Sequence, residues 1–276
     1  MSVKFINLTK KSFLKNSPLF KIISLDRVDS YLGDNPCLWF SNLEYWNDAF
    51  EKRFVEMKYK KGSKLLDYPL KNKIFCTCFS DQRICEAQWY VYSGNKSIAD
   101  CIGLKINRIK LLEILEKYSI QHNNDVYIGK VEYQTTTEII SSVSKNSFLN
   151  KGKKKFDIND RNSQLRLLLL KRNAFIYEDE IRIFIIRNEN QLDTASRGIS
   201  MSCHCKANEL VQEVIMNPQF AILDNLKKRL ETPLGKATSS GKGFGFELIK
   251  DSMGKPHPRV VVSRLYDYQH SKYIEL

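Results

Sequence analysis

The chain has 276 residues, enough to bury a substantial apolar core in one large domain or two small ones. Hydrophobic residues make up 42% of it, which excludes an intrinsically disordered protein. Forty-four lysines and arginines against 31 acidic residues leave a formal charge of +13, so the surface is expected to attract polyanions such as nucleic acid. The alternative is that the lysines are spread evenly as solvated charge.

The amino-terminal residues contain no uninterrupted apolar run of signal-peptide length, and no window approaches the roughly 20 apolar residues of a membrane span. We therefore expect a cytoplasmic protein without a membrane partner. Seven cysteines are an odd number, and Cys76/Cys78 and Cys203/Cys205 stand in apolar surroundings. This pattern favours buried thiols over disulfides, and the one-residue spacing departs from that of structural zinc sites, so no metal is expected.

Apolar segments bounded by Asp, Gly, Asn or Ser predict strands in the first half of the chain, at residues 19–24, 36–41, 73–80, 98–106 and 126–134. Helical spacing predicts a short helix, a helical turn and a longer helix at residues 26–32, 87–92 and 108–118.

The second half begins with a lysine-rich segment, 147–157, which predicts a solvated loop. A helix is predicted over residues 160–174, capped by Asp157 or Asp160. Residues 180–186 form the most β-branched run and predict a central strand. The remaining elements are expected to be a strand, two helices, a loop and a last strand at 198–204, 207–216, 222–230, 235–245 and 259–265. With neither an internal repeat nor a boundary, we expect one α+β domain over residues 1–276, with a mixed central sheet and flanking helices.

The chain contains several short motifs, each occurring once: Leu38-Trp39-Phe40-Ser41, Asn47-Asp48-Ala49-Phe50-Glu51, Cys78-Phe79-Ser80, Trp89-Tyr90-Val91-Tyr92, Gly103-Leu104, and Phe175 to Arg182 preceded by Lys171. In these the chain resembles a widespread bacterial family of unknown function that is associated with phage-defence and abortive-infection genes. Family members usually carry Pro where Ala49 stands and Met where Gln88 stands. The polar positions that match are Asn47, Asp48, Glu51, Tyr92, Glu178, Glu180 and Arg182.

The resemblance implies a shared fold, a cluster of these polar residues, and a defence or toxin-type effector. It also leaves room for control by a regulatory partner protein.

Glu178 and Glu180 are two residues apart, so in an extended backbone both carboxylates lie on one face. A Glu-x-Glu pair serves ADP-ribosyltransferases, and the chain has a looser likeness to that fold, with Lys21 on an early strand and Tyr92 in the middle. It lacks the usual Arg or His of the first motif and the Ser-Thr-Ser strand. This likeness implies an NAD-consuming transferase or glycohydrolase, with Glu180 as catalytic carboxylate and Glu178 as its helper.

In that hypothesis Lys21 and Arg182 bind phosphate or carboxylate, and Trp89 or Tyr92 offers a stacking platform to a flat ring. The alternative is structural: Glu178 and Glu180 form salt bridges with Arg182 and Lys171 where the strand begins.

Asn47, Asp48 and Glu51 form a second polar set. They predict a helix start with Asn47 as cap and Asp48 and Glu51 on one face. Alternatively, Asp48 and Glu51 join the late glutamates in a carboxylate cluster that holds Mg²⁺, as a nuclease toxin requires.

A third hypothesis is a non-enzymatic basic module that binds nucleic acid or a protein. Its phosphate contacts would come from the lysines of 151–155 and from Arg161, Arg166, Lys171 and Arg172. Trp89, Tyr90 and Tyr92 would stack on bases.

Overall fold

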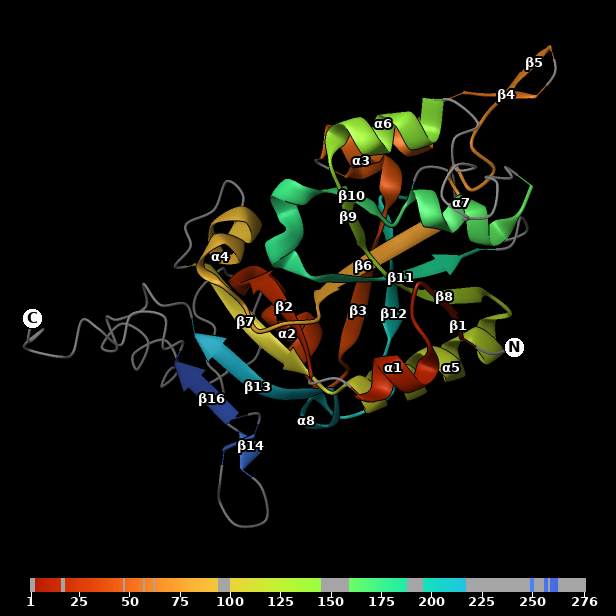
Figure 1. Cartoon of the computed structure of the whole chain (residues 1–276). Helices are drawn as coiled ribbons and strands as arrows, with labels where there is room; N and C mark the ends of the chain where they lie inside the picture. Colours follow the sequence, from red (N-terminus) through yellow and green to blue (C-terminus); the bar gives the residue numbers. More distant parts are fainter. Residues whose placement is uncertain are drawn as a thin grey trace, which may run out of the picture. The chain divides into compact units, whose positions relative to one another are not determined.

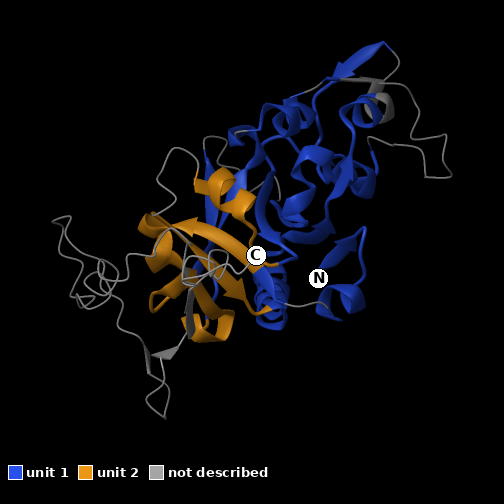
Figure 2. Cartoon of the chain, turned by 60° about the vertical axis from the view of Figure 1, so that its left-hand side comes forward, with its two compact units in different colours: residues 1–19, 37–82, 108–204 blue, residues 20–36, 83–107, 205–276 orange. Residues whose placement is uncertain are grey.

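The computed structural model describes residues 3–15, 18–46, 48–56, 58–61, 63–93, 100–144, 159–187, 196–216, 249–250, 256–257 and 259–262. The protein is α+β, with a mixed sheet flanked by helices, as expected (Figure 1). It divides into two compact units, each assembled from three stretches of chain (Figure 2). Unit 1 comprises residues 1–19, 37–82 and 108–204, and unit 2 the remainder. The expectation of a single domain stays a prediction.

The strands of unit 1 centre on β11 (Glu180–Ile186), in which every residue is buried. It pairs antiparallel with β6 (Ile74–Ser80) on one side and with β8 (Asp125–Lys130) on the other. The prediction of a central strand at this β-branched run is confirmed, since a strand covered on both faces is apolar throughout. Outside these, β1 (Lys4–Ile6) pairs parallel with β8, β3 (Cys37–Asn42) antiparallel with β6, and β12 (Gly198–Ser202) antiparallel with β3.

The helices of unit 1 include α1 (Lys10–Lys15), α3 (Ala49–Glu56), α5 (Arg108–His122), α6 (Thr136–Ser144) and α7 (Arg161–Leu167), with the 3₁₀ turns η2 (Leu43–Tyr45) and η5 (Asn173–Glu178). α5 packs on β8, and α1 packs on α5. Two small sheets complete the unit: β9 (Glu132–Gln134) with β10 (Leu170–Arg172), and β4 (Tyr59–Lys61) with β5 (Lys64–Leu66).

The helix predicted over residues 160–174 is wrong in its second half. Asp160 caps α7, accepting a hydrogen bond from the Ser163 N–H at 2.8 Å, which confirms one of the two predicted caps. The helix then ends at Leu167, and β10 follows, paired in parallel with β9. Local periodicity favoured one helix, but pairing with a distant strand decides the conformation.

Unit 2 holds η1 (Leu25–Arg27), α2 (Val28–Leu32), α4 (Glu86–Ser93), α8 (Ala207–Leu210) and the two-stranded pair β14 (Ile249–Lys250) and β15 (Pro256–His257). Its larger strands follow the order β2 (Leu19–Ser24), β7 (Cys101–Ile106), β13 (Val211–Met216) and β16 (Arg259–Val262).

The prediction of a helix at 207–216 is wrong for most of its length. Only one turn, α8, is helical, and the β-branched stretch from Val211 forms β13, antiparallel to β7 and parallel to β16. The elements predicted at 147–157, 222–230 and 235–245 lie outside the described residues.

The core of unit 2 is built around Trp89, which is 1% exposed. A Cβ on Gly103 of β7 would lie 2.5 Å from Ile84 Cδ1 and 3.2 Å from the Trp89 ring. The glycine therefore makes room for the indole, a close approach that a side chain would prevent.

Among the described residues, no helix combines the length and the apolar character that crossing a membrane requires.

Candidate functional site

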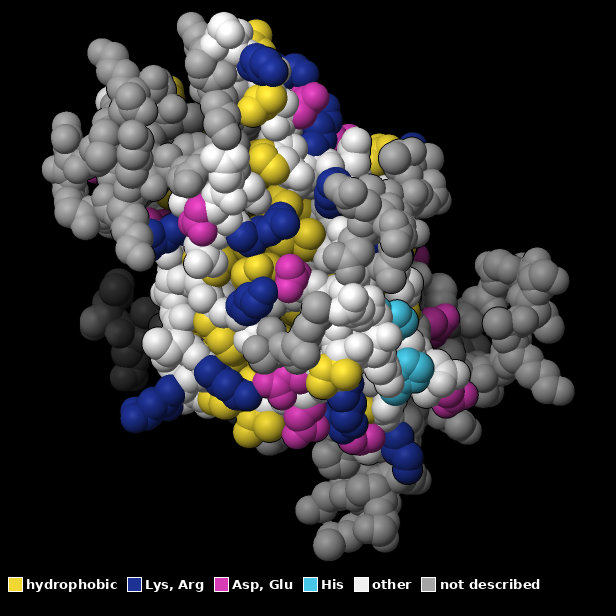
Figure 3. Space-filling view, turned by 90° about the vertical axis from the view of Figure 1, so that its right-hand side faces the viewer, with side chains coloured by type: hydrophobic (Ala, Val, Ile, Leu, Met, Phe, Trp, Pro, Cys, Tyr) yellow, Lys and Arg dark blue, Asp and Glu magenta, His cyan; other side chains and the backbone are white. Residues whose placement is uncertain are grey.

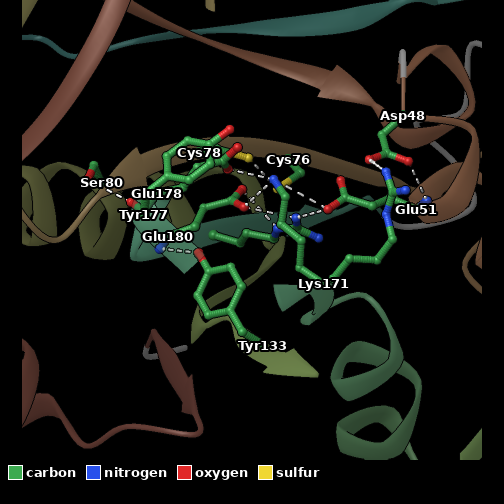
Figure 4. A network of polar contacts seen from close by, with 12 residues as sticks. Asp48, Glu51, Cys76, Cys78, Ser80, Tyr133, Lys171, Tyr177, Glu178 and Glu180 are labelled. Carbon is green, nitrogen blue, oxygen red and sulfur yellow. Dashed lines mark hydrogen bonds and ion pairs between the residues drawn. The ribbon is translucent and has the colours of Figure 1, made fainter. Parts of the chain in front are cut away.

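Five charged side chains meet inside unit 1 and form what we term the carboxylate–cation network (Figure 4). Its members and their exposed fractions are Glu51 (7%), Lys171 (8%), Glu178 (2%), Glu180 (2%) and Arg182 (1%). Four of them were singled out in the sequence as site residues. The fifth, Lys171, was expected only as a salt-bridge partner or a phosphate contact.

The network is assembled from four elements. Glu180 and Arg182 are two residues apart at the start of β11, so both side chains project from the same face of the strand. Glu178 ends η5, and Asp179 then turns the chain into β11 with φ of 43°, a left-handed conformation that Asp tolerates better than most residues. Lys171 comes from β10 and Glu51 from α3.

Arg182 is the best-coordinated member, because each nitrogen of its guanidinium donates a hydrogen bond. Nε donates to Glu180 Oε1 at 2.9 Å, and Nη2 donates to Glu180 Oε2 at 3.0 Å and Glu51 Oε1 at 2.7 Å. Nη1 donates to the carbonyl oxygen of Leu168 at 2.5 Å. The Trp46 ring lies 4.7 Å from the guanidinium carbon, so the cation is also stacked.

Lys171 joins the three carboxylates. Its Nζ lies 2.6 Å from Glu178 Oε2, 3.0 Å from Glu180 Oε2 and 3.4 Å from Glu51 Oε1. Three carboxylates therefore share two cations, and the network has one formal negative charge in excess.

Lys171 and Glu180 stay ionised although burial disfavours their charged forms. Burial by itself would raise the pKa of Glu180, but the charges of Arg182 and Lys171 outweigh it and hold that pKa well below its usual range. Burial would likewise lower the pKa of Lys171, but the charge of Glu180 raises it well above the usual value. Both groups stay ionised at neutral pH.

Two neutral side chains, Tyr133 and Cys78, border the network, and no motif had singled out Tyr133. The Tyr133 hydroxyl accepts a hydrogen bond from the Glu180 N–H at 2.9 Å, and burial raises the pKa of this phenol. Cys78 Sγ lies 4.0 Å from Cys76 Sγ. The contact with Cys76 and burial raise the pKa of the Cys78 thiol, which disfavours the thiolate form that a nucleophilic cysteine needs.

Asp48 has a capping role. Its Oδ1 accepts hydrogen bonds from the backbone N–H of Phe50 at 2.7 Å and of Glu51 at 3.4 Å, which fixes the start of α3. Its Oδ2 accepts from Arg172 Nη2 at 3.0 Å. The helix begins one residue later than expected, with Asp48 in the capping position, and Asn47 lies outside the described residues.

The other predicted site residues belong to unit 2. Lys21 is half-buried on β2, Trp89 is buried in the core, and Tyr92 is 43% exposed on α4. A pocket that joins them to Glu180 of unit 1 stays a prediction.

Asp48, Glu51 and the two late glutamates do not form a ready metal site. Within the described ranges, no group of three or more His, Cys, Asp or Glu side chains is arranged to hold a metal ion. The carboxylate oxygens of Glu51, Glu178 and Glu180 instead face Lys171 and Arg182.

A second set of charges, the outer ion cluster, was not predicted; it comprises Asp81, Arg108, Lys130 and Asp179. Asp81 accepts from Arg108 and, at 2.8 Å, from Lys130, which also lies 2.6 Å from Asp179. Burial raises the pKa of Asp81, but hydrogen bonds from Lys130 and Arg108 leave it below the usual value. These residues are far apart in the sequence and share no motif, so no signal pointed to them.

Comparison with known proteins adds no relative: no family model, curated protein or solved structure matches the chain.

Proposed function

We propose that this protein is a non-enzymatic module that binds nucleic acid through its basic surface, while the carboxylate–cation network supports the fold of unit 1. The observation that carries the proposal is the burial of Glu178 and Glu180, each 2% exposed, against Lys171 and Arg182. A catalytic carboxylate must reach the reacting atom of its substrate. Both oxygens of Glu180 already accept hydrogen bonds from buried cations.

The charge of the chain supports nucleic acid as the ligand. The formal charge of +13 favours a polyanion, and neutralising phosphates releases their counterions. On α4 of unit 2, Tyr90 and Tyr92 are 51% and 43% exposed, whereas Trp89 is buried. Exposed rings of this kind stack on unpaired bases with about 1–3 kcal/mol per base.

The proposal is tested with a labelled single-stranded oligonucleotide, whose fluorescence anisotropy is followed from about 50 to about 300 mM salt. We expect binding that weakens steeply with salt. Tyr90→Ala/Tyr92→Ala should lower the affinity about tenfold or more, and Tyr90→Phe/Tyr92→Phe, which keeps both rings, should bind as wild type does. Absence of binding at low salt would contradict the proposal.

A second candidate is the NAD-consuming ADP-ribosyltransferase or glycohydrolase. It is favoured by the convergence of motifs as far apart as Glu51 and Arg182, 131 positions in sequence, on one cluster. Buried ion pairs can often be replaced by apolar residues without loss of stability, so stability alone is a weak reason to keep this network. In this candidate the network opens to expose Glu180, with Glu178 as its helper.

One assay separates the two candidates. Purified protein is incubated with NAD, with and without total nucleic acid, and wild type is compared with Glu180→Gln. The binding module predicts that NAD and nucleic acid both stay intact. Loss of NAD with wild type alone, while circular dichroism shows Glu180→Gln to be folded, would instead support the enzyme.

A further inference from the structure

The strands β4 and β5 of unit 1 form a hairpin that pairs with no other strand among the described residues. Figures 1 and 2 show it projecting from the remaining elements of that unit. Every residue of β5 is exposed, and Leu65, at 68%, is more exposed than any other large hydrophobic side chain that the structure describes. We call residues 58–61 and 63–67 the hairpin arm.

The hairpin arm is strongly basic. It contains four lysines and a single acid, and Lys58 is held by that acid, Asp67, in an ion pair at 2.5 Å. The pairing register sets Lys61 opposite Lys64, and Lys60 opposite Leu65. Figure 3 shows Lys and Arg side chains beside hydrophobic ones toward the top of the view.

This register is unfavourable for the arm alone. Like charges at directly opposite positions of an antiparallel pair repel each other, and Asp67 is already engaged by Lys58. An anion brought to the end of the arm relieves that repulsion. The exposed Leu65 adds an apolar contact beside the charges.

We propose that the hairpin arm enters the major groove of double-helical DNA; this inference rests on the proposed nucleic-acid function. The groove is about 12 Å wide and admits a two-stranded ribbon. The end of the ribbon, to which both strands contribute lysines, is then set against the phosphates that line the groove, and Leu65 contacts a sugar or a thymine methyl group. Double-helical RNA is a poorer fit, because its major groove is too narrow for side chains to read.

An anionic membrane is the rival partner for a basic, partly apolar arm. Anchoring at a bilayer surface requires a broad apolar face in addition to basic residues. The described part of the arm offers two exposed leucines, Leu65 and Leu66, which is too little for such a face.

The test compares binding of a DNA duplex about two helical turns long, an RNA duplex of the same sequence, and anionic phospholipid vesicles. The variant is Lys60→Ala/Lys61→Ala/Lys64→Ala. Its matched control removes three exposed lysines from α1 and α5, Lys11→Ala/Lys15→Ala/Lys117→Ala, with the same change in charge. Thermal unfolding of each variant checks that the fold is retained.

For wild type we expect DNA duplex to be bound more tightly than RNA duplex. The arm variant should lose about tenfold or more in DNA affinity, and its slope of log K against log salt should be shallower by about 2 to 3. The control triple should show smaller changes in both the DNA affinity and the salt slope. Leu65→Ser should weaken DNA binding a few-fold at unchanged slope, because it removes no charge.

The outcomes separate the inference from the function on which it rests. If wild type binds DNA and the arm variant binds it equally well, the inference about the arm is wrong. It is also wrong if the control triple loses as much affinity as the arm variant does. Arm-dependent binding of vesicles with no binding of DNA also overturns it, in favour of a membrane surface. If wild type binds neither duplex nor single strand, the proposed function itself fails.

Discussion

Unit 1 contains two clusters of opposite charges that differ in their access to water. In the carboxylate–cation network no side chain is more than 10% exposed. In the outer ion cluster the side chains of Asp81 and Arg108 are as deeply buried, but those of Lys130 and Asp179 are 26% and 38% exposed. Water screens an exposed pair and can solvate a partner left behind, whereas a buried charge depends on the protein.

The tripeptide Glu178-Asp179-Glu180 divides between the two clusters. Both glutamates pair with Lys171, Glu180 also pairs with Arg182, and Asp179 pairs with Lys130. Carboxylates in adjacent residues are therefore expected to contribute differently to the stability of the fold, depending on which cluster they join. The contrast teaches that acidic motifs must be placed before they are interpreted.

The largest effect is expected from Arg182→Met, which leaves Glu51 and Glu180 without their main cation. We expect the free energy of unfolding to fall by about 3–5 kcal/mol, measured by urea denaturation. The matched control is Arg53→Met on the exposed side of α3, where the change should stay within about 0.5 kcal/mol. Equal effects at the two arginines would break the contrast between buried and exposed charge.

The next effect concerns acid stability. Because the pKa of Glu180 is lowered in the folded protein, its contribution to stability is present above its unfolded pKa, about 4.5, and is lost as the pH falls below that value. Between about pH 4.5 and about pH 2.5, Glu180→Gln should flatten the pH dependence of the unfolding free energy by up to about 1.4 kcal/mol per pH unit. Glu113→Gln, at a side chain 53% exposed on α5, should keep the wild-type slope. A wild-type slope in Glu180→Gln would show that Glu180 is not held ionised by the network.

The smallest effect is expected at Asp179, the most exposed member of the outer ion cluster. Asp179→Asn keeps a residue that tolerates the left-handed backbone and removes only the charge that faces Lys130. The unfolding free energy should change by less than about 1 kcal/mol. A loss as large as that of Arg182→Met would mean that the two clusters act as one unit.

The sequence predicted the fold where local pattern and tertiary pairing agree. The run at 180–186 was recognised as a central strand, because continuous β-branched residues suit a strand buried on both faces. It failed at 207–216, since Val211, Val214 and Ile215 fit a helical face as well as a strand, and pairing with β7 decided the outcome. The hairpin formed by β4 and β5 was not predicted, because lysines obscure the alternation of a strand.

The candidate site was predicted in part. Glu178 and Glu180 were expected together because alternate residues of a strand share a face, but only Glu180 belongs to the strand: Glu178 ends η5, and Asp179 turns the chain with φ of 43°. Salt bridges to Lys171 and Arg182 were predicted as the structural alternative. Tyr133 and the outer ion cluster were not foreseen, since their contacts join strands and helices whose neighbours no local pattern reveals.

The most direct test of the central claim, that the network supports the fold and not a reaction, is to measure unfolding free energy and nucleic-acid affinity together for Glu180→Gln. We expect the free energy of unfolding to fall by about 1–3 kcal/mol, because a buried cation loses its carboxylate, and the nucleic-acid affinity of the folded variant to stay unchanged. Unchanged stability together with lost binding or lost NAD turnover would contradict this claim and assign Glu180 to a functional site.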